Sequence, residues 1–212
     1  MKKIVIGCGL VFLIIALLFV GLSFAYKGIT ENNLENRLET VHNNWIELLE
    51  LQDEKNNLLK ELIHDSLLDI QYVDSLNMSL IEYNKNRNEL KECNPKFVYE
   101  QYLSNKYMLP IMKFYSEKNQ LLDLKSKTSI NNIQNNIEKL NKVIDQYNLS
   151  VRSYNTFYLT FPNFIIAKSS GFKKKDYFQI QFGVENTDPK RVREERIKEL
   201  KEIEKKYGLN EE

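Results

Sequence analysis

The chain contains few of the residues that interrupt regular structure, with seven glycines and four prolines among 212 residues. A sandwich or barrel of many short strands needs turns at close intervals, so this composition disfavours both and favours a few long helices. Cysteine is equally scarce, and two residues, Cys8 and Cys93, cannot form a disulfide framework. The net charge of +1 gives no support for binding through overall charge to nucleic acid, so no such partner is expected.

Charge is missing altogether from one stretch, the 23 residues 4–26. A helix of that length covers about 35 Å, which is more than the hydrocarbon core of a bilayer, about 30 Å thick. Lys2 and Lys3 precede the run and Lys27 follows it. The sequence therefore predicts a single transmembrane anchor after a short flank at residues 1–3, with the lipid bilayer as a binding partner.

A cleavable signal peptide is the alternative interpretation of this stretch. Ser23 and Ala25 form a small-residue pattern before a cut at Tyr26. The apolar run is much longer than the roughly 7–15 residues of a signal peptide, which favours an uncleaved anchor. Lys2, Lys3 and the terminal amine before the run slightly outweigh Lys27 and Arg37 after it, which predicts a cytoplasmic N-terminus and an extracytoplasmic helical domain.

After the anchor, the spacing of apolar residues predicts long helices over residues 27–182. An apolar seam at alternating steps of four and three residues begins with Leu34, Leu38, Val41, Trp45 and Leu48. Gln52 and Lys55 take the next two positions of the seam, after which it resumes. The pattern leaves open whether residues 28–91 form one helix or two. Asn94-Pro95 ends this stretch, because the residue before proline is disfavoured in a helix.

Two further helices follow in the pattern. The first covers about residues 97–126 and contains Pro110, which predicts a kink or a short break. The second is capped by Thr128 or Ser129 and keeps its apolar stripe as far as Tyr158. A short helical turn then begins at about residue 163, and Gly171 is placed to end it in the left-handed conformation.

The period changes near the C-terminus. Phe178, Ile180 and Phe182 alternate with polar residues, which predicts an extended segment with one apolar face. Residues 183–212 are predicted to be a charged, helical tail. The predicted fold class is therefore all-α, with an N-terminal transmembrane helix, a long antiparallel helical bundle and a short extended segment.

Candidate catalytic residues are few. Glu39 with His42, and Glu61 with His64, have the Glu-x-x-His spacing that di-iron bundles use, but such a site also needs further glutamates on facing helices. Cys93 has no histidine nearby in the sequence. We therefore assign no catalytic, metal-binding or cofactor-binding residue, expect no cofactor, and predict that the protein is not an enzyme.

The most specific pattern lies between residues 147 and 178, where two Tyr-Asn steps flank Val-Arg and are followed by Phe-Pro, Ala, Gly-Phe and Tyr-Phe. In this order and spacing the chain resembles the LemA family. The residues that carry the resemblance are Tyr147, Asn148, Val151, Arg152, Tyr154, Asn155, Phe161, Pro162, Ala167, Gly171, Phe172, Tyr177 and Phe178. The resemblance implies a membrane-anchored antiparallel helical bundle of bacterial origin, without an established enzymatic activity.

The chain departs from the family pattern at two places. Ile144 and Asp145 stand where many members carry arginines, and residues 55–59 replace a proline-containing stretch of the first soluble helix. A family role that rests on those positions therefore does not transfer to this chain.

Asn148, Arg152 and Asn155 form a polar stripe beside the tyrosines of the same helix. In a structural interpretation the stripe ties this helix to a neighbouring backbone or carboxylate, and replacing Arg152 or Tyr154 by alanine destabilises the fold. In a functional interpretation the stripe and the run of lysines at residues 173–175 bind an acidic peptide, a lipid head group or a partner protein.

These observations predict a non-enzymatic scaffold or adaptor at the membrane surface with an unidentified protein partner. The alternative is a peptide- or small-ligand-binding sensor that uses the Tyr-Asn and Arg face. A homo-oligomer is compatible with either function.

Overall fold

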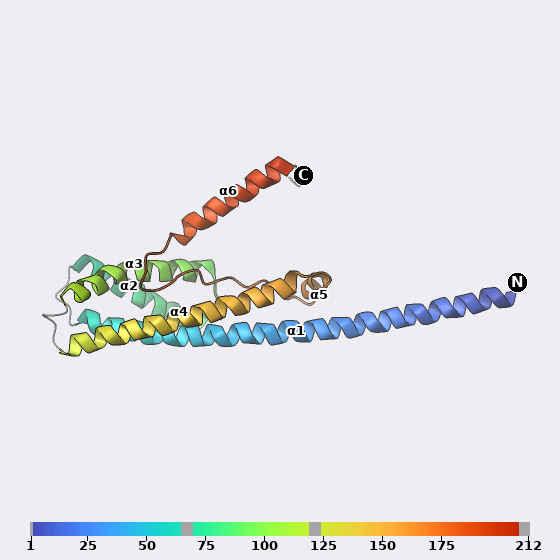
Figure 1. Ribbon diagram of the computed structural model, residues 1–212, viewed down its shortest axis with the longest axis horizontal. Coiled ribbons are helices and arrows are strands. Elements are labelled where there is room, and N and C mark those ends of the chain that lie inside the picture. Colours follow the sequence, from blue (N-terminus) through green and yellow to red (C-terminus); the bar gives the residue numbers. More distant parts are fainter. Residues whose placement is uncertain (1, 65–69, 119–123, 208–212) are drawn as a thin grey trace. The chain divides into compact units, whose positions relative to one another are not determined.

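The protein is built from helices. A computed structural model describes residues 2–64, 70–118 and 124–207, and the chain forms no strand within these ranges. Its elements are α1 (Lys2–His64), α2 (Ile70–Asn86), a 3-10 turn η1 (Arg87–Glu89), α3 (Pro95–Glu117), α4 (Leu124–Leu159), α5 (Asn163–Ser169) and α6 (Pro189–Tyr207) (Figure 1). The prediction of an all-α fold is confirmed.

The chain divides into two compact units, each made from two separate parts of the sequence. Unit 1 comprises Met1–His42 and Ser150–Lys175, and therefore holds the first part of α1, the end of α4, and α5. Unit 2 comprises Asn43–Leu149 and Asp176–Glu212, which include the rest of α1 and α4 and all of α2, α3 and α6. Both α1 and α4 are thus shared by the two units.

The apolar seam of α1 is buried, as its spacing predicts. Leu34 and Val41 are buried in unit 1, and Trp45 and Leu48 in unit 2. The polar residues that continue the seam are buried as well, so the burial of α1 continues where its apolar pattern stops.

The structure gives helix ends that the sequence left open or placed elsewhere. The sequence left open whether residues 28–91 form one helix or two, and in the structure α1 ends at His64 and α2 begins at Ile70. The helix predicted over 97–126 ends at Glu117, and α4 begins at Leu124; the residues between 118 and 124 lie outside the described ranges.

The prediction that Thr128 or Ser129 caps α4 is wrong. The Thr128 hydroxyl donates to the Leu124 carbonyl oxygen (2.9 Å) from within the helix, because the helix has already begun one turn earlier. That first turn has no buried side chain and no apolar period, so the pattern could not reveal it. Of the kink or short break predicted at Pro110, the break is absent, because α3 continues through the proline.

Aromatic rings fill the core of unit 2, where α2 and α3 lie side by side (Figure 1). The ring centroids of Trp45 and Phe97 are 5.4 Å apart in an edge-to-face arrangement, and those of Trp45 and Tyr147 are also 5.4 Å apart. Phe97 in turn packs against Phe178 at 5.9 Å. Such contacts stabilise by about 0.5–1.5 kcal/mol each beyond the burial of area. The helices α1, α3 and α4 therefore share one core with the extended segment, residues 172–182.

In unit 1, a short helix closes against α4 and α1. Tyr154 of α4 and Ala167 of α5 are completely buried. Gly171 has the predicted left-handed conformation (φ +80°), and the Phe172 N–H donates to the Ala167 carbonyl oxygen (2.9 Å) as the chain leaves α5. The predicted end of this helix at Gly171 is confirmed.

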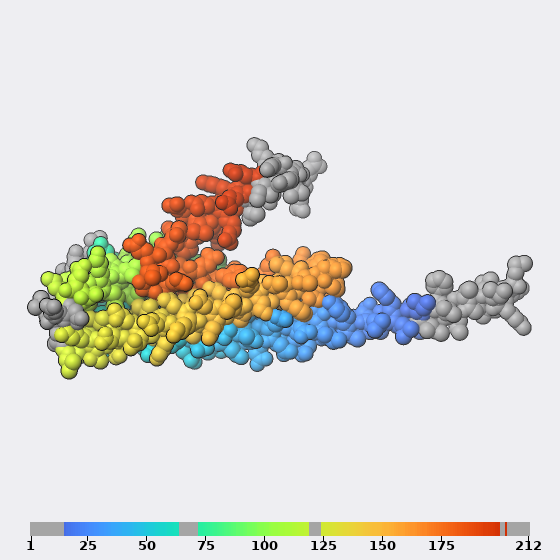
Figure 2. Space-filling model, in the orientation of Figure 1, coloured from blue at the N-terminus to red at the C-terminus, as the bar shows by residue number. Residues whose placement is uncertain are grey.

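The N-terminal part of α1 has exposed apolar side chains, in contrast to the buried seam that follows it. From Ile15 to Ile29, nine large apolar side chains are 41–72% exposed, and Figure 2 shows this stretch uncovered on the face in view. Where side chains are described, no helix has a stretch apolar and long enough to cross a membrane. Residues 4–14 of the predicted anchor, including Cys8, lie outside the residues whose side chains are described.

Candidate functional site

The two Tyr-Asn steps of α4 hold the extended segment that follows α5. In unit 2, the Tyr147 hydroxyl donates to the Asp176 carbonyl oxygen (2.9 Å). The Asn148 amide then binds both backbone groups of Phe178: its nitrogen donates to the carbonyl oxygen (2.8 Å), and its oxygen accepts from the N–H (2.9 Å). The side chain therefore takes the place of a neighbouring strand.

Unit 1 repeats the same geometry seven residues further along α4. The Tyr154 hydroxyl donates to the Lys173 carbonyl oxygen (2.9 Å), and the Asn155 amide binds the carbonyl oxygen (2.8 Å) and N–H (2.9 Å) of Lys175. In both steps the tyrosine contacts the residue two positions before the one that the asparagine holds. A Tyr-Asn step is thus a three-bond clamp on an extended backbone.

Two further asparagines act in the same way, although the sequence patterns did not single them out. Asn141, seven residues before Asn148, binds the Phe182 carbonyl oxygen (3.0 Å) and N–H (2.9 Å). Asn105 of α3 accepts from the Gly183 N–H (3.0 Å) and donates to the Val184 carbonyl oxygen (2.7 Å). The seven-residue recurrence of asparagine on α4 was the available signal.

These clamps bond backbone N–H and carbonyl groups of a segment that has no strand partner in the described ranges. A buried backbone N–H or carbonyl without a hydrogen bond is costly, and an asparagine offers one donor and one acceptor side by side. The predicted alternation is confirmed, with Phe178, Ile180 and Phe182 buried and the glutamines between them exposed.

The remaining residues of the pattern fall into distinct environments. Val151 is fully buried, whereas Arg152 is exposed and makes no hydrogen bond or ion pair that the described residues reveal. The pattern's buried residues are Tyr147, Val151, Tyr154, Asn155, Ala167 and Phe178; its half-buried ones are Asn148, Pro162 and Phe172; its exposed ones are Arg152, Phe161, Gly171 and Tyr177. The structure thus brings the tyrosines and asparagines together, but not the arginine.

Burial keeps the hydroxyls and the thiol near this segment in their neutral forms. It raises the pKa of Tyr147, with Cys93 and Asp176 adding to the effect, and raises the pKa of Tyr154 to about 12. Burial likewise raises the pKa of Cys93, whose thiol donates to the Tyr177 carbonyl oxygen (3.7 Å). A thiol of raised pKa is a poor nucleophile.

A second polar cluster lies inside unit 2, where the seam of α1 becomes polar. Lys55 is fully buried, and its ammonium nitrogen lies 3.7 Å from the centroid of the Phe182 ring. Burial holds the pKa of Lys55 well below its usual range. Its neighbours on α1 include Gln52, which donates to Gln101 of α3, and Asn56.

Several atoms of this cluster have no hydrogen-bond partner among the described residues. They are the Lys55 nitrogen, both polar atoms of the Asn56 amide, and one oxygen each of Gln52 and Asn136. Buried groups of this kind are normally satisfied by internal water. The interruption of the apolar seam at Gln52 and Lys55 was the sequence signal for this cluster.

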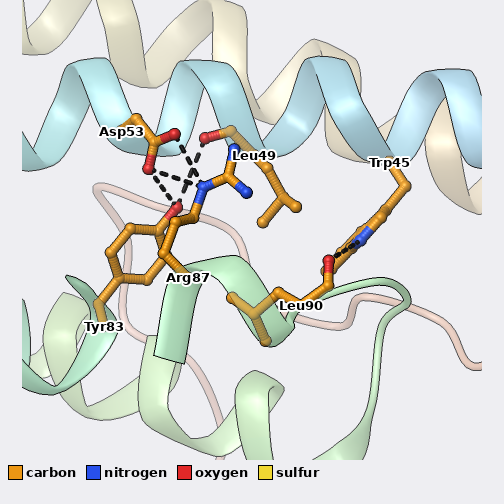
Figure 3. A network of polar contacts seen from close by, with 6 residues as sticks. All are labelled: Trp45, Leu49, Asp53, Tyr83, Arg87 and Leu90. Carbon is orange, nitrogen blue, oxygen red and sulfur yellow. Dashed lines mark hydrogen bonds and ion pairs between the residues drawn. The ribbon is translucent and has the colours of Figure 1, made fainter. Parts of the chain in front are cut away.

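A third network ties α2 and η1 to α1 (Figure 3). The Asp53 carboxylate accepts from the Tyr83 hydroxyl (2.7 Å) and from Arg87 Nε (2.8 Å), and Trp45 Nε1 donates to the Leu90 carbonyl oxygen (3.0 Å). Burial and the adjacent carboxylate raise the pKa of Tyr83, which keeps it a donor. Sequence patterns gave no sign of this network.

The Glu-x-x-His pairs form no metal site among the residues that the structure describes. Glu39, His42 and Glu61 are exposed, and the side chain of His64 lies outside the described residues. In the described part of the chain, no three His, Cys, Asp or Glu residues are grouped closely enough to hold a metal ion.

A groove of about 710 Å³ runs between α3, the extended segment and α6 in unit 2. Lys190 of α6 lies over the Tyr99 ring, 3.6 Å from its centroid. Cationic side chains of Lys96, Arg193 and Arg196 line the groove, together with Glu100 and Asp176.

These features define an all-helical protein in which side-chain amides hold an extended segment against long helices. The LemA family matches the chain over residues 80–192, which is more than half of its length and includes both Tyr-Asn steps. The chain belongs to the LemA family. Neither the curated proteins nor the solved structures contain a match.

Proposed function

We propose that this LemA family protein is a non-enzymatic scaffold or adaptor, anchored in the membrane by residues 4–26 and presenting its helical units to a protein partner at the membrane surface. The observation that carries the proposal is the change of environment along α1. Its apolar side chains are exposed on all sides from Ile15 to Ile29, and its seam is buried from Leu34 onward.

An apolar helix that is exposed around its whole circumference is unfavourable in water. Each large side chain transferred from water to an apolar medium gains about 1.5–3 kcal/mol, and nine such side chains are exposed here. A bilayer supplies that medium, and helices that are apolar all round are found in protein cores or in membranes. The uncharged sequence on the N-terminal side extends the apolar stretch to the length that a span requires.

A charge at the middle of the proposed span tests the anchor. Ile15→Arg places an arginine where insertion costs about 2.5–3.5 kcal/mol, so part of the protein should leave the membrane pellet on alkaline carbonate washing. Ile29→Arg is the matched control, because Ile29 is equally exposed on the same helix but lies outside the uncharged run. Wild type and the control should stay in the pellet. Extraction of all three proteins alike would contradict the proposal.

The N-terminus is proposed to face the cytoplasm and the helical units the opposite side, because the two lysines and the terminal amine before the run outweigh the positive charges after it. Protease added to intact spheroplasts should then digest the helical units. Protection there, with digestion after lysis, would reverse the orientation.

The sensor alternative has weaker support. A ligand on the Tyr-Asn face would need Asn148 and Asn155, but both amides already bind the backbone of the same chain. Arg152 is the polar group of that stripe left exposed, and a single exposed arginine does not make a pocket.

A further inference from the structure

The turn around α5 is tied to the end of the apolar run of α1 within unit 1. We name residues 159–170 the α5 corner. The Tyr26 hydroxyl donates to the Asn163 side-chain oxygen (2.6 Å), and the Ser170 hydroxyl donates to the carboxylate of Glu31. Since Tyr26 is the last residue of the uncharged run, these bonds place the corner at the level where that run ends.

The α5 corner exposes large apolar side chains. Phe161 is 74% exposed, Leu159 52% and Ile165 51%, while Asn163 and Ala167 face inward and are buried. Three such side chains within seven residues form an exposed apolar patch, and patches of this kind on soluble surfaces usually mark contact with a protein or a membrane.

The chain segment that contains the corner has charges of one sign only. From Ser150 to Lys175 there are five basic residues and no acidic residue. Lys168, Lys173 and Lys174 are exposed. The acidic group bonded to the corner, Glu31, also faces Lys27 at 3.7 Å. An apolar patch bordered by exposed lysines is complementary to an anionic membrane surface, in which acyl chains lie beneath negative head groups.

We propose that the α5 corner is a second membrane contact, in which Phe161 and Ile165 enter the head-group region of an anionic bilayer and the neighbouring lysines pair with lipid phosphates. The inference rests on the proposed anchor, because the anchor brings the corner to the bilayer surface. Both the position and the charge of the corner favour lipid over a protein partner.

Fluorescence quenching by lipid tests this contact in the full-length chain. Phe161→Trp is expected to lose much of its added emission in vesicles of phosphatidylglycerol and phosphatidylcholine when the phosphatidylcholine carries bromine near the head of its acyl chains. Met78→Trp is the matched control, since Met78 is 72% exposed but lies on α2 in unit 2. The native Trp45 is buried in unit 2 and contributes the same background to both variants.

Flotation of the same vesicles separates the two proposals. A full-length chain that does not float with vesicles overturns the anchor and the corner contact together. A Phe161→Trp chain that floats while bromine leaves its added emission unchanged overturns the corner contact alone. Equal quenching in the Met78→Trp variant would also overturn it, because the contact would then not be specific to the corner.

A separate variant tests whether the lysines pair with lipid phosphates. Replacing Lys168, Lys173 and Lys174 together by glutamine in the Phe161→Trp chain should reduce the quenching of its added emission in vesicles that contain phosphatidylglycerol, and should change it little in phosphatidylcholine alone. Unchanged quenching in both vesicles would overturn the pairing with lipid phosphates. All three side chains are exposed, so the substitutions should leave the thermal unfolding of the protein as it is.

Discussion

Asn148 and Arg152 lie one turn apart on α4 and have opposite environments. The amide of Asn148 satisfies both backbone groups of Phe178, whereas Arg152 is exposed. The sequence suggested one polar stripe with a shared role, because three polar residues at steps of four and three occupy one side of a helix. The structural interpretation of the stripe predicts that replacing Arg152 by alanine destabilises the fold. The exposure of Arg152 argues against that prediction.

Replacement of Asn148 by alanine is expected to destabilise the fold. It strands the N–H and carbonyl of Phe178, and each buried unsatisfied group costs about 1–3 kcal/mol. Thermal unfolding of the protein in detergent should therefore show a lower midpoint for Asn148→Ala. Arg152→Ala is the control and should stay within about 0.5 kcal/mol of wild type. A midpoint for Asn148→Ala equal to that of the control would show that the clamp is not stabilising.

The buried Lys55 makes the stability of the fold depend on pH, and the direction of its pKa shift sets the sign of that dependence. Since burial lowers its pKa in the folded state, the unfolded chain binds more protons between that lowered pKa and the ordinary value of about 10.4. Stability contributed through Lys55 therefore rises with pH across this window, by at most about 1.4 kcal/mol per pH unit, and is constant above it.

The comparison with Lys55→Met isolates this effect, because methionine fills similar space without a titrating group. Melting midpoints of both proteins at pH 7 and pH 9 should show that wild type gains relative to the variant as the pH rises. At pH 7 the variant should be the more stable of the two, since it leaves no amine buried. A difference between the two midpoints that does not change with pH would mean that Lys55 keeps its ordinary pKa.

At the scale of elements, the extended segment has a glycine in a left-handed backbone conformation at each of its two ends. Gly171 precedes it with a φ of +80°, and Gly183 follows it with a φ of +79°. Both values are in the left-handed region, where a side chain costs roughly 1–2 kcal/mol. The two sites differ in their surroundings, because an added Cβ has open space at Gly171 but would lie 3.2 Å from the Ile137 side chain at Gly183.

Alanine at each glycine should therefore destabilise the protein, and Gly183→Ala should do so more than Gly171→Ala. The backbone strain is common to both, while the close contact with Ile137 and the nearby Asn105 bond to the Gly183 N–H are affected at one site only. Denaturation midpoints of the two variants measure the difference. The opposite order would indicate that Ile137 moves aside at little cost.

The elements also show which features a sequence reveals. The long helices and the alternation at Phe178, Ile180 and Phe182 were predictable because burial of one face imposes a period on the sequence. The first turn of α4 and the end of α3 were not predictable, since turns that bury no apolar face impose no period on the sequence. Lys55, which is buried, and Asp53, which is half-buried, contact residues far away in the chain, and a local pattern cannot identify those partners.

At the scale of the whole molecule, the sequence predicted the helical fold class and the family but not the division into two units. That division falls inside α1 and α4, near Asn43 and Ser150, where neither helix has a proline or a glycine to mark it. It arises from which segments pack together, and packing of distant segments leaves no local trace. Identification of the Tyr-Asn steps succeeded for a different reason, because their spacing repeats along one helix.

The clamps of α4 determine which substitutions, insertions and deletions the extended segment can tolerate during evolution. An asparagine that binds only N–H and carbonyl groups recognises a position in the backbone and not the side chain attached to it. Lys175 and Phe178 are held by the same chemistry although one is basic and the other aromatic. The segment is therefore free to exchange its outward side chains, whereas loss or gain of a single residue between Lys175 and Phe182 would move the backbone groups away from their amides. Its length is constrained more tightly than its composition.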